Sequence, residues 1–565
     1  MANKGFQSQI FKQALNYRFF VADKFAMNLI RKFLILCFLF ALCAALWQCA
    51  RRGNPTGGPK DIEPPVLLRT DPENLTTNFD GNTIRLYFDE YIKLEDVQNQ
   101  LVVSPPLKYQ PEITPQGSAS KYIELTFKDT LRENTTYTVN FGQSIVDNNE
   151  GNPNSFLSYV FSTGDYIDSL SLSGAVKDAF NRTADQFVSV MLYEIDSIYN
   201  DSSIYKYPPN YITNTLDSLP LFQLNNLKAG SYRLFAIKDK GKNNVFDQRA
   251  DKIGFLTDTI TLPTDSIYLL TLFKEVPDYS ASVPSYVAKN RIIFGYQGER
   301  KDIAINTLTT MPDSVKTRIQ KEREKDTLNY WLTPTDIDSI IFTVTNERLQ
   351  AIDTFTVKTR KLEMDTLQLT PSHRSQIGFE DKFHLLANTP LVNIDSSKVS
   401  IIDKDTVDVP FSMTLDTIVN KVDVDFDIVD NQSYDITILP GAIEDFFGEQ
   451  NDTLNFKPTT GSYADFGNLT LNLSGVVTYP LIIQLTTEKG ELEREIVSDQ
   501  PKPYEFSNLR PGNYGVRIIF DENGNGKWDT GNYLKKIQPE SIKYYPDIIE
   551  IRSNWEKNET FVISE

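Results

Sequence analysis

The chain of 565 residues is longer than one hydrophobic core normally supports, which favours several domains of about 100 residues each. Its formal charge of -18 at pH 7 argues against nucleic acid as a partner, because neutralising phosphates requires clustered Lys and Arg. The three cysteines, Cys37, Cys43 and Cys49, all lie in or at the end of an apolar N-terminal stretch, so the folded body has no cysteines for disulfides or for a cysteine-rich zinc site. The chain has only two histidines, which argues against most metal-hydrolase and His-based nucleophile sites.

The N-terminus predicts export. Arg31 and Lys32 precede the apolar run 33–42, which is too short for a typical membrane span and fits a signal peptide over 27–48, with Met27 as a plausible start. The stretch ends in Leu46-Trp47-Gln48-Cys49, which resembles a bacterial lipobox, although Gln48 replaces the usual small residue.

The lipobox resemblance implies acylation, including palmitate-type chains, of Cys49 and anchoring in the outer membrane through a flexible tether over 49–61. A cleaved soluble form and an uncleaved anchor are the alternatives. The leaflet stays open between periplasm and cell surface, since the acidic run that directs Bacteroidota lipoproteins to the surface is absent after Cys49.

Residues 62–165, the A module, predict an antiparallel β-sandwich. Runs such as 83–88 and 122–127 alternate apolar and polar residues and are separated by Asn, Asp, Gly and Pro. Pro64-Pro65, Phe88-Asp89-Glu90 and the closing run 159–164 resemble the bacterial Ig-like domain of Bacteroidota lipoproteins.

Residues 166–275, the B module, open with the strand pattern 170–176 and contain an Asn-Leu-x-x-Gly-x-Tyr turn over 226–232. The module resembles the transthyretin-like or prealbumin-like sandwiches of bacterial surface proteins. We expect Gly230, and Gly512 in the second copy of the turn, to supply a backbone conformation that a Cβ disfavours.

Residues 276–375, the spacer, carry further strand patterns such as 338–345. A charged run over 312–326 interrupts them and is expected to form a short helix or a mobile insertion. We therefore predict one more β-rich domain with a helical excursion.

The A and B modules recur as A′, a degenerate Ig-like copy over 376–462, and B′, a prealbumin-like copy over 463–565. Residues 224–232 match 506–514 without a gap, 239–247 match 521–529, and the opening run 170–176 resembles 471–477. The fold class is therefore all-β: tandem antiparallel β-sandwiches with a duplicated two-module block. Duplication of whole domains directs the search for function to contact surfaces.

The B′ match contains a candidate cation site. Asp521, Asn523, Asn525 and Asp529 place oxygen side chains at alternating positions, with Gly526 at the sixth, and so resemble the start of a calcium loop. An Asn stands where the twelfth, acidic ligand is expected. The alternative is a hairpin whose polar side chains satisfy backbone groups; beyond calcium, no cofactor is predicted.

An aspartate followed by Ser or Thr and an aliphatic residue recurs along the body. The pattern resembles the O-glycosylation sequence of exported Bacteroidota proteins, and such glycans would add solubilising cover. The alternative is that turn-to-strand junctions favour these residues. The hydroxyl positions include Thr130, Ser169, Ser218, Thr259, Thr327, Thr366, Thr417 and Thr453.

No residue set predicts catalysis, so the protein is not expected to be an enzyme. With 75 acidic residues, pairs such as Asp89-Glu90 arise by chance, although two carboxylates would suffice for a glycosidase. His373 and His384 lie far in sequence from any convincing Ser or Asp motif and are expected to be solvated loop residues.

These features together favour a non-catalytic, lipid-anchored outer-membrane protein that holds partners. One version is a scaffold or accessory subunit of a secretion, uptake or β-barrel assembly complex, with outer-membrane proteins or other lipoproteins as partners. The alternative is a cell-surface glycan-binding or adhesive protein. It requires clustered exposed aromatic residues, but Trp331, Trp528 and Trp555 are scattered.

Overall fold

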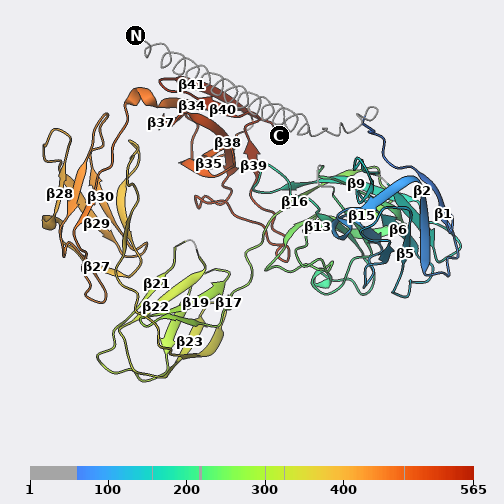
Figure 1. Ribbon diagram of the computed structural model, residues 1–565, viewed down its shortest axis with the longest axis horizontal. Helices are drawn as coiled ribbons and strands as arrows, with labels where there is room; N and C mark the ends of the chain where they lie inside the picture. The colour runs from blue at the N-terminus through green and yellow to red at the C-terminus, as the bar shows by residue number, and fades with distance from the viewer. Residues whose placement is uncertain are drawn as a thin grey trace, which may run out of the picture. The chain divides into compact units, whose positions relative to one another are not determined.

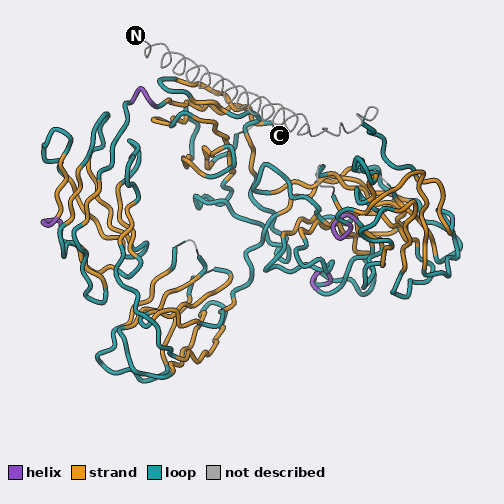
Figure 2. Tube along the Cα trace, in the orientation of Figure 1, coloured by secondary structure: helices purple, strands orange, loops and turns teal. Residues whose placement is uncertain are grey.

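The structure is a computed structural model that describes residues 60–564 except 156, 216–218, 300, 324 and 476 (Figure 1). The predicted signal peptide, Cys49 and nearly all of the tether lie outside the described residues. Strands form almost all of the regular structure in the described part (Figure 2), which confirms the all-β fold of tandem sandwiches. No helix among the described residues has both the length and the apolar character needed to cross a membrane.

The A module has two antiparallel sheets. One has the order β1-β2-β5-β4 with β7 also on β2, and the other has the order β3-β6-β8. Ile84, Leu86 and Phe88 of β2 are buried in one core, as their alternation predicts. The bounds are β1 Leu67–Asp71, β2 Thr83–Leu94, helix α2 Val97–Gln100, β3 Val102–Ser104, β4 Glu112–Thr114, β5 Ser120–Thr126, β6 Thr136–Asn140, β7 Ile145–Asp147 and β8 Ser158–Ser162.

The B module pairs a sheet of order β11-β10-β13-β14, with β15 also on β13, with a sheet of order β12-β9-β16. In the second sheet β16 runs parallel to β9, an exception to the antiparallel pairing. The bounds are β9 Leu170–Asp178, β10 Ser189–Glu194, the 3-10 turn η1 Ser203–Tyr205, β11 Tyr211–Asn214, β12 Leu221–Leu227, β13 Gly230–Lys238, β14 Lys252–Phe255, β15 Ile260–Leu262 and β16 Ile267–Leu272.

The spacer also forms two sheets, β17-β19-β22-β21 with β18 on β19, and β20-β23-β24. The expected helix in the charged run is wrong, because Thr317–Lys321 forms β21 and pairs with β22. Arg318 and Gln320, on one face of β21, donate to backbone carbonyls of A′ at 3.0 Å each, so tertiary contacts override the local pattern. The other bounds are β17 Ser280–Ala281, β18 Ser285–Ala288, β19 Arg291–Gln297, β20 Ile303–Thr307, β22 Thr327–Leu332, β23 Ser339–Asn346 and β24 Ala351–Lys358.

A′ repeats the sheet order of A. Its sheets are β25-β26-β30-β29, β28-β31-β33 and the pair β27-β32, and they enclose one core. The bounds are β25 Leu369–Pro371, β26 Phe383–Ala387, β27 Leu391–Ile394, η2 Ser396–Lys398, β28 Val399–Ile402, β29 Phe411–Asp416, β30 Lys421–Phe426, β31 Asp435–Ile438, β32 Ile443–Asp445 and β33 Leu454–Phe456.

B′ repeats the sheet order of B, with β36-β35-β38-β39, β40 on β38, and β37-β34-β41, in which β41 runs parallel to β34. The bounds are η3 Tyr463–Asp465, β34 Gly467–Gly475, β35 Leu481–Thr487, β36 Leu492–Ser498, β37 Tyr504–Leu509, β38 Gly512–Phe520, β39 Ile542–Tyr544, β40 Ile549–Ile551 and β41 Glu556–Ile563.

Two details of the repeat differ from expectation. The sequence match of 170–176 with 471–477 makes Leu172 equivalent to Leu473. In the structure, however, Leu224 lies opposite Leu172, and its repeat counterpart Phe506 lies opposite Leu469. The first strands of the two modules are therefore equivalent in a register four residues away from the sequence match. A strand in which Leu alternates with polar residues fits several even registers, and only its pairing selects one.

The turn glycines do not adopt the left-handed conformation. Asn226 and Asn508 adopt it instead, each with φ 55, whereas Gly230 and Gly512 do not. Asn tolerates this conformation better than other residues with a Cβ. The prediction for the two glycines is therefore wrong, and the turn depends on the asparagines.

Candidate functional site: the contact between the B modules

The predicted calcium loop lies between β38 and β39 and is closed by its own hydrogen bonds. The buried carboxylate of Asp521 accepts the backbone N–H groups of Asn525 and Gly526 at 3.1 and 2.8 Å. The Asn525 amide donates to Asp529 Oδ2 at 2.6 Å, and Asn523 donates to the same oxygen. The four predicted residues thus come together in contacts that fit the hairpin alternative, and calcium binding stays a prediction.

Glu540 completes this loop and has no signal in the 521–529 pattern. Its buried carboxylate accepts the N–H groups of Glu522 at 3.0 Å and Asp529 at 2.9 Å, and Trp528 Nε1 donates to its carbonyl at 3.1 Å. Burial raises the pKa of Glu540, and the charges of Asp529 and Asp521 raise it further. Even so, no three or more His, Cys, Asp or Glu side chains in the described part are grouped to hold a metal ion.

The first copy of the loop uses a similar closing acid. Buried Asp251 accepts the N–H groups of Lys240 at 2.8 Å and Asp247 at 2.9 Å. Asp239, whose pKa burial raises, accepts the Asn244 N–H at 2.7 Å. In both copies, an acid that follows the motif therefore fixes the loop.

B′ carries seven more residues than B after this loop. In B, Phe235 of β13 pairs with Phe255 of β14, and in B′ the equivalent residues Arg517 and Tyr544 pair in the same way. Arg517 lies 282 positions after Phe235, but Tyr544 lies 289 positions after Phe255, so B′ has seven additional residues between the two strands. The extra residues lie within 530–541, a segment that we name the plug. The plug contacts B.

Tyr533 of the plug is buried in B. It is 2% exposed, and its ring centroid lies 5.2 Å from those of Phe235 and Phe255, with interplanar angles of 86° and 69°. Its hydroxyl donates to Asp201 at 3.2 Å, and its N–H donates to the Glu275 carboxylate. Edge-to-face aromatic pairs of this kind add to the burial of apolar area.

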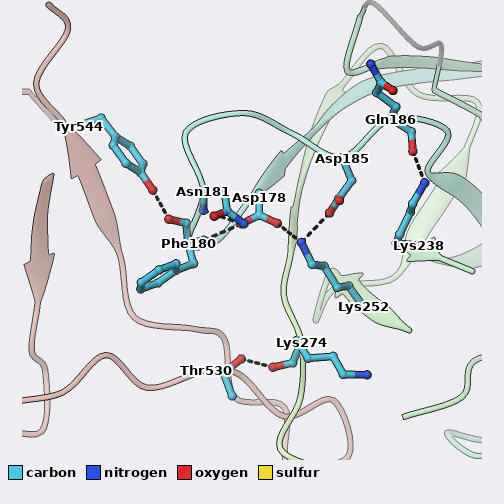
Figure 3. Close-up of polar contacts among 10 residues, drawn as sticks. All are labelled: Asp178, Phe180, Asn181, Asp185, Gln186, Lys238, Lys252, Lys274, Thr530 and Tyr544. Carbon is cyan, nitrogen blue, oxygen red and sulfur yellow. Dashed lines mark hydrogen bonds and ion pairs between the residues drawn. The ribbon is translucent and has the colours of Figure 1, made fainter. Parts of the chain in front are cut away.

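Polar contacts extend the interface on both sides of Tyr533. Thr530 Oγ1 donates to the Lys274 carbonyl at 2.6 Å, and the Tyr544 hydroxyl donates to the Phe180 carbonyl (Figure 3). Gln538 Nε2 donates to the carbonyl of Phe255 at 3.0 Å. Because three of these acceptors are backbone carbonyls of B, the contact depends on the path of the B chain as well as on its side chains.

An ion pair in B orders the loop that carries Phe180. The Asp178 carboxylate accepts the N–H groups of Phe180 at 2.9 Å and Asn181 at 2.6 Å (Figure 3). Lys252 Nζ lies 2.7 Å from Asp178 and 2.6 Å from Asp185. Burial alone would lower the pKa of Lys252, but these bonds raise it, so the ammonium stays charged.

The two copies differ in the sheet face that takes part in this contact. On this face, β10 and β13 of B carry apolar side chains where β35 and β38 of B′ carry polar ones. The strand registers make Met191 equivalent to Gln484, Tyr193 to Thr486 and Phe235 to Arg517. Arg517 donates to Gln484 at 2.5 Å, and its guanidinium lies 4.3 Å from the Phe180 ring centroid. The duplicated modules have thus diverged into a receptor, B, and a module that carries the plug, B′.

Glu275 is the buried acid of the interface. Besides the Tyr533 N–H, it accepts Gln248 Nε2 at 2.9 Å. Burial raises its pKa, and neighbouring Asp278 adds to the rise. The interface is therefore predicted to respond to pH.

The turn shared by the two copies of the repeat connects each B-type module to the Ig-like module before it. Asn226 accepts the Thr138 hydroxyl of A at 3.1 Å, and Asn508 donates to Glu380 of A′ at 3.1 Å. The same Asn therefore has the same role in both blocks, which the motif alone did not indicate.

The structure brings His373 closer to Ser and Asp groups than expected. Its Nδ1 lies 2.9 Å from Ser372 Oγ, and its Nε2 lies 3.2 Å from Asp381. A serine nucleophile site contains these three groups. Here the Ser372 hydroxyl accepts the His384 N–H at 3.0 Å and donates to the Lys382 carbonyl at 3.3 Å, so it is engaged in holding the β25–β26 hairpin.

The other predicted positions have structural surroundings. Asp89 accepts the Val66 N–H at 2.8 Å and so ties β2 to the chain before β1. Trp331 is buried, Trp528 is half-buried beside Phe180, and Trp555 is exposed, so these three do not form one aromatic platform.

The Asp-Ser/Thr-aliphatic hydroxyls are mostly accessible. Ser218 lies outside the described residues, and Thr327 is half-buried. The remaining quoted positions are exposed: Thr130, Ser169, Thr259, Thr366, Thr417 and Thr453. Exposure is a requirement for glycosylation but also fits turn-to-strand junctions, so both interpretations stay open.

Comparison with known proteins identifies one module. Residues 61–163 match the family model of the bacterial Ig-like domain, as expected for A. No curated protein matches the chain in sequence.

Similar solved structures include three proteins. The S-layer protein rSbsC is 12% identical, with 84% of this chain and 66% of that chain covered and a TM-score of 0.15, so this chain spans just under two thirds of its length. SGBP-B of the Bacteroides ovatus mixed-linkage glucan utilization locus is 11% identical, with 67% and 94% covered and a TM-score of 0.17. The major pilin BcpA of Bacillus cereus is 12% identical, with 70% and 99% covered and a TM-score of 0.13. At these TM-scores the likenesses carry no functional argument.

Proposed function

We propose that the protein is a non-catalytic, lipid-anchored outer-membrane protein that holds partner proteins. It would act as a scaffold or accessory subunit of an envelope complex for secretion, uptake or β-barrel assembly. The observation that carries this proposal is the docking of B′ on B, which joins modules far apart in sequence through the buried Tyr533. A closed contact of this kind fixes binding surfaces in place and so reduces the entropy lost when a partner binds.

The anchoring part of the proposal rests on the sequence. Acyl chains on Cys49 and a tether rich in Gly and Pro would keep the modules near the membrane while allowing them to reach a neighbouring protein.

Affinity purification from mild-detergent membranes tests the proposal. The tagged protein and its Cys49→Ser variant are purified in parallel, and the recovered proteins are identified by mass spectrometry. We expect outer-membrane proteins or other lipoproteins in a fixed ratio to the tagged protein, and their loss with Cys49→Ser. Recovery of the tagged protein alone from both preparations would contradict the proposal.

A cell-surface glycan-binding or adhesive role is the second candidate. It is favoured by a groove between A and B whose polar lining consists of hydroxyl and amide groups, which suit sugar hydroxyls. The exposure of Trp555 alone among Trp331, Trp528 and Trp555 weighs against it. Binding of the purified protein to immobilised glycans would support this candidate.

A further inference from the structure

The β12-β9-β16 sheet of B has an exposed apolar outer face. Leu221 of β12 and Leu269 of β16 lie on either side of Ala175 in one row, and Ile267 lies opposite Ser173 in the next row. Leu221, Leu269 and Ile267 are 56%, 53% and 81% exposed. Exposed apolar residues that form rows on one face, unlike scattered ones, indicate a contact surface.

The second copy of the module has polar residues at three of the corresponding positions. The registers of β34 with β37 and β41 give the counterparts of Ala175, Ile267 and Leu269, which are Asn472, Asn558 and Thr560. The fold therefore does not require apolar residues at these positions, and B has them for another reason.

The other outer face of B shows what such a difference means in this protein. There too, B is apolar where B′ is polar, and the apolar residues are covered by a docked segment, the plug with Tyr533. On the β12-β9-β16 face, Leu221, Leu269 and Ile267 are more than half exposed to solvent. By the same reasoning, we expect this face to be covered by another molecule.

A groove of about 750 Å³ adjoins this face, between B and A. In a chain with 23% charged residues, its lining in the described part has no charged residue. Among the lining residues are Thr138, Asn140 and Ser158 of A, and Leu221, Gln223 and Asn225 of β12. A charged ligand would lose hydration here without gaining an opposite charge, so the groove suits an uncharged occupant.

The row of apolar side chains indicates how the occupant lies. Leu221, Ala175 and Leu269 follow one another across β12, β9 and β16, and Leu221, Ala175 and Ile267 also line the groove. An extended segment points alternate side chains to one side and so can follow such a row. We propose that the groove and this face bind an uncharged, extended segment of a partner protein, which crosses β12, β9 and β16 and places apolar side chains on Leu221 and Ile267. This inference rests on the proposed function, because it names the surface that holds the partner.

A labelled model peptide tests the inference. The probe is a fluorescein-labelled octapeptide of alternating Thr and Val, and its binding to the full chain in detergent is followed by fluorescence anisotropy. The variant Ala175→Asn/Ile267→Asn/Leu269→Thr carries the residues of B′, which folds with them at these positions. The control is Ile352→Asn in the spacer, where the replaced side chain is 71% exposed and lies in another module.

We expect the unmodified chain and Ile352→Asn to bind the peptide with equal affinity. The triple variant should bind about tenfold or more weakly, because it loses most of the apolar contact area, and its thermal unfolding should match that of the unmodified chain. A peptide with Glu in place of each Val should not bind. No saturable binding, equal affinity of the triple variant, or displacement of the peptide by a neutral oligosaccharide such as maltoheptaose would overturn the inference.

The same variant separates this inference from the proposed function. If affinity purification recovers partners equally with the unmodified chain and the triple variant, the groove is not the holding surface although the proposed function stands. If no partner is recovered with either chain while the peptide binds only the unmodified one, the proposed function fails and the groove remains a peptide site.

Discussion

Replacing Tyr533 with Ala should release the plug from B. The side chain is 2% exposed and makes edge-to-face contacts with Phe235 and Phe255 at 5.2 Å. Burial of an aromatic ring contributes about 1.5–3 kcal/mol, and each aromatic pair adds about 0.5–1.5 kcal/mol. The expected loss is therefore about 3–5 kcal/mol, in the range of aromatic-to-Ala changes in cores.

Hydrogen–deuterium exchange of the intact protein measures this loss at the plug. In the unmodified chain the backbone N–H of Tyr533 donates to Glu275 and should exchange slowly. In Tyr533→Ala the plug peptides should exchange at least a hundredfold faster, while the core strands of A keep their protection. Leu534→Ala is the matched control, since the neighbouring Leu534 is 54% exposed and should change exchange little.

Equal exchange of the plug in Tyr533→Ala and Leu534→Ala would refute the reasoning. That result would mean that Tyr533 does not hold B′ on B.

Other predictions concern the interface and the loops. Phe235→Arg places the B′ residue on the apolar face of B and should speed exchange of the plug about tenfold or more, because it removes the ring that packs edge-to-face on Tyr533 and buries a charge in its place. Unchanged protection would contradict this. Because the folded state raises the pKa of Glu275, its stabilisation is complete below the ordinary value of 4.5 and is lost as pH rises through the raised pKa. At pH values above the raised pKa, Glu275→Gln should therefore have a higher Tm than the unmodified chain, whereas below pH 4.5 the two should have the same Tm. A lower Tm of the variant at about pH 8 would argue against this. A fluorophosphonate probe should not label Ser372, because its hydroxyl is held in the β25–β26 hairpin. Labelling that is lost in Ser372→Ala would instead show that Ser372 is a nucleophile. Calcium should leave the Tm unchanged if the 521–529 loop is a hairpin, whereas a rise that Asp529→Ala abolishes would establish the cation site.

The sequence predicts the modules well because the signal is periodic and duplicated. Alternation places Ile84, Leu86 and Phe88 in the A core, and the matched segments 224–232 and 506–514 occupy equivalent strands of B and B′. The four residues of the predicted calcium loop also come together, because all of them lie in one short turn.

The contact between B and B′ could not be predicted in the same way. The plug has no apolar period, and the partners of Tyr533, such as Phe235, lie about 300 positions away in the sequence. The sequence feature that marks the plug is that B′ has more residues than B between the 521–529 loop and the next strand. This difference becomes visible only when the structure shows which strands are equivalent in the two copies. Glu540 and Asn226 were missed for a related reason, since each acts through contacts that a local motif does not contain.

The central claim is that B and B′ dock into one frame, and a distance between them tests it most directly. Spin labels at Tyr207→Cys in B and Leu492→Cys in B′, both exposed positions, are introduced in a chain whose native cysteines are replaced by Ser, and double electron–electron resonance gives the distance distribution. The account predicts one narrow distribution, which Tyr533→Ala broadens. A broad distribution that is the same with and without Tyr533→Ala would contradict it.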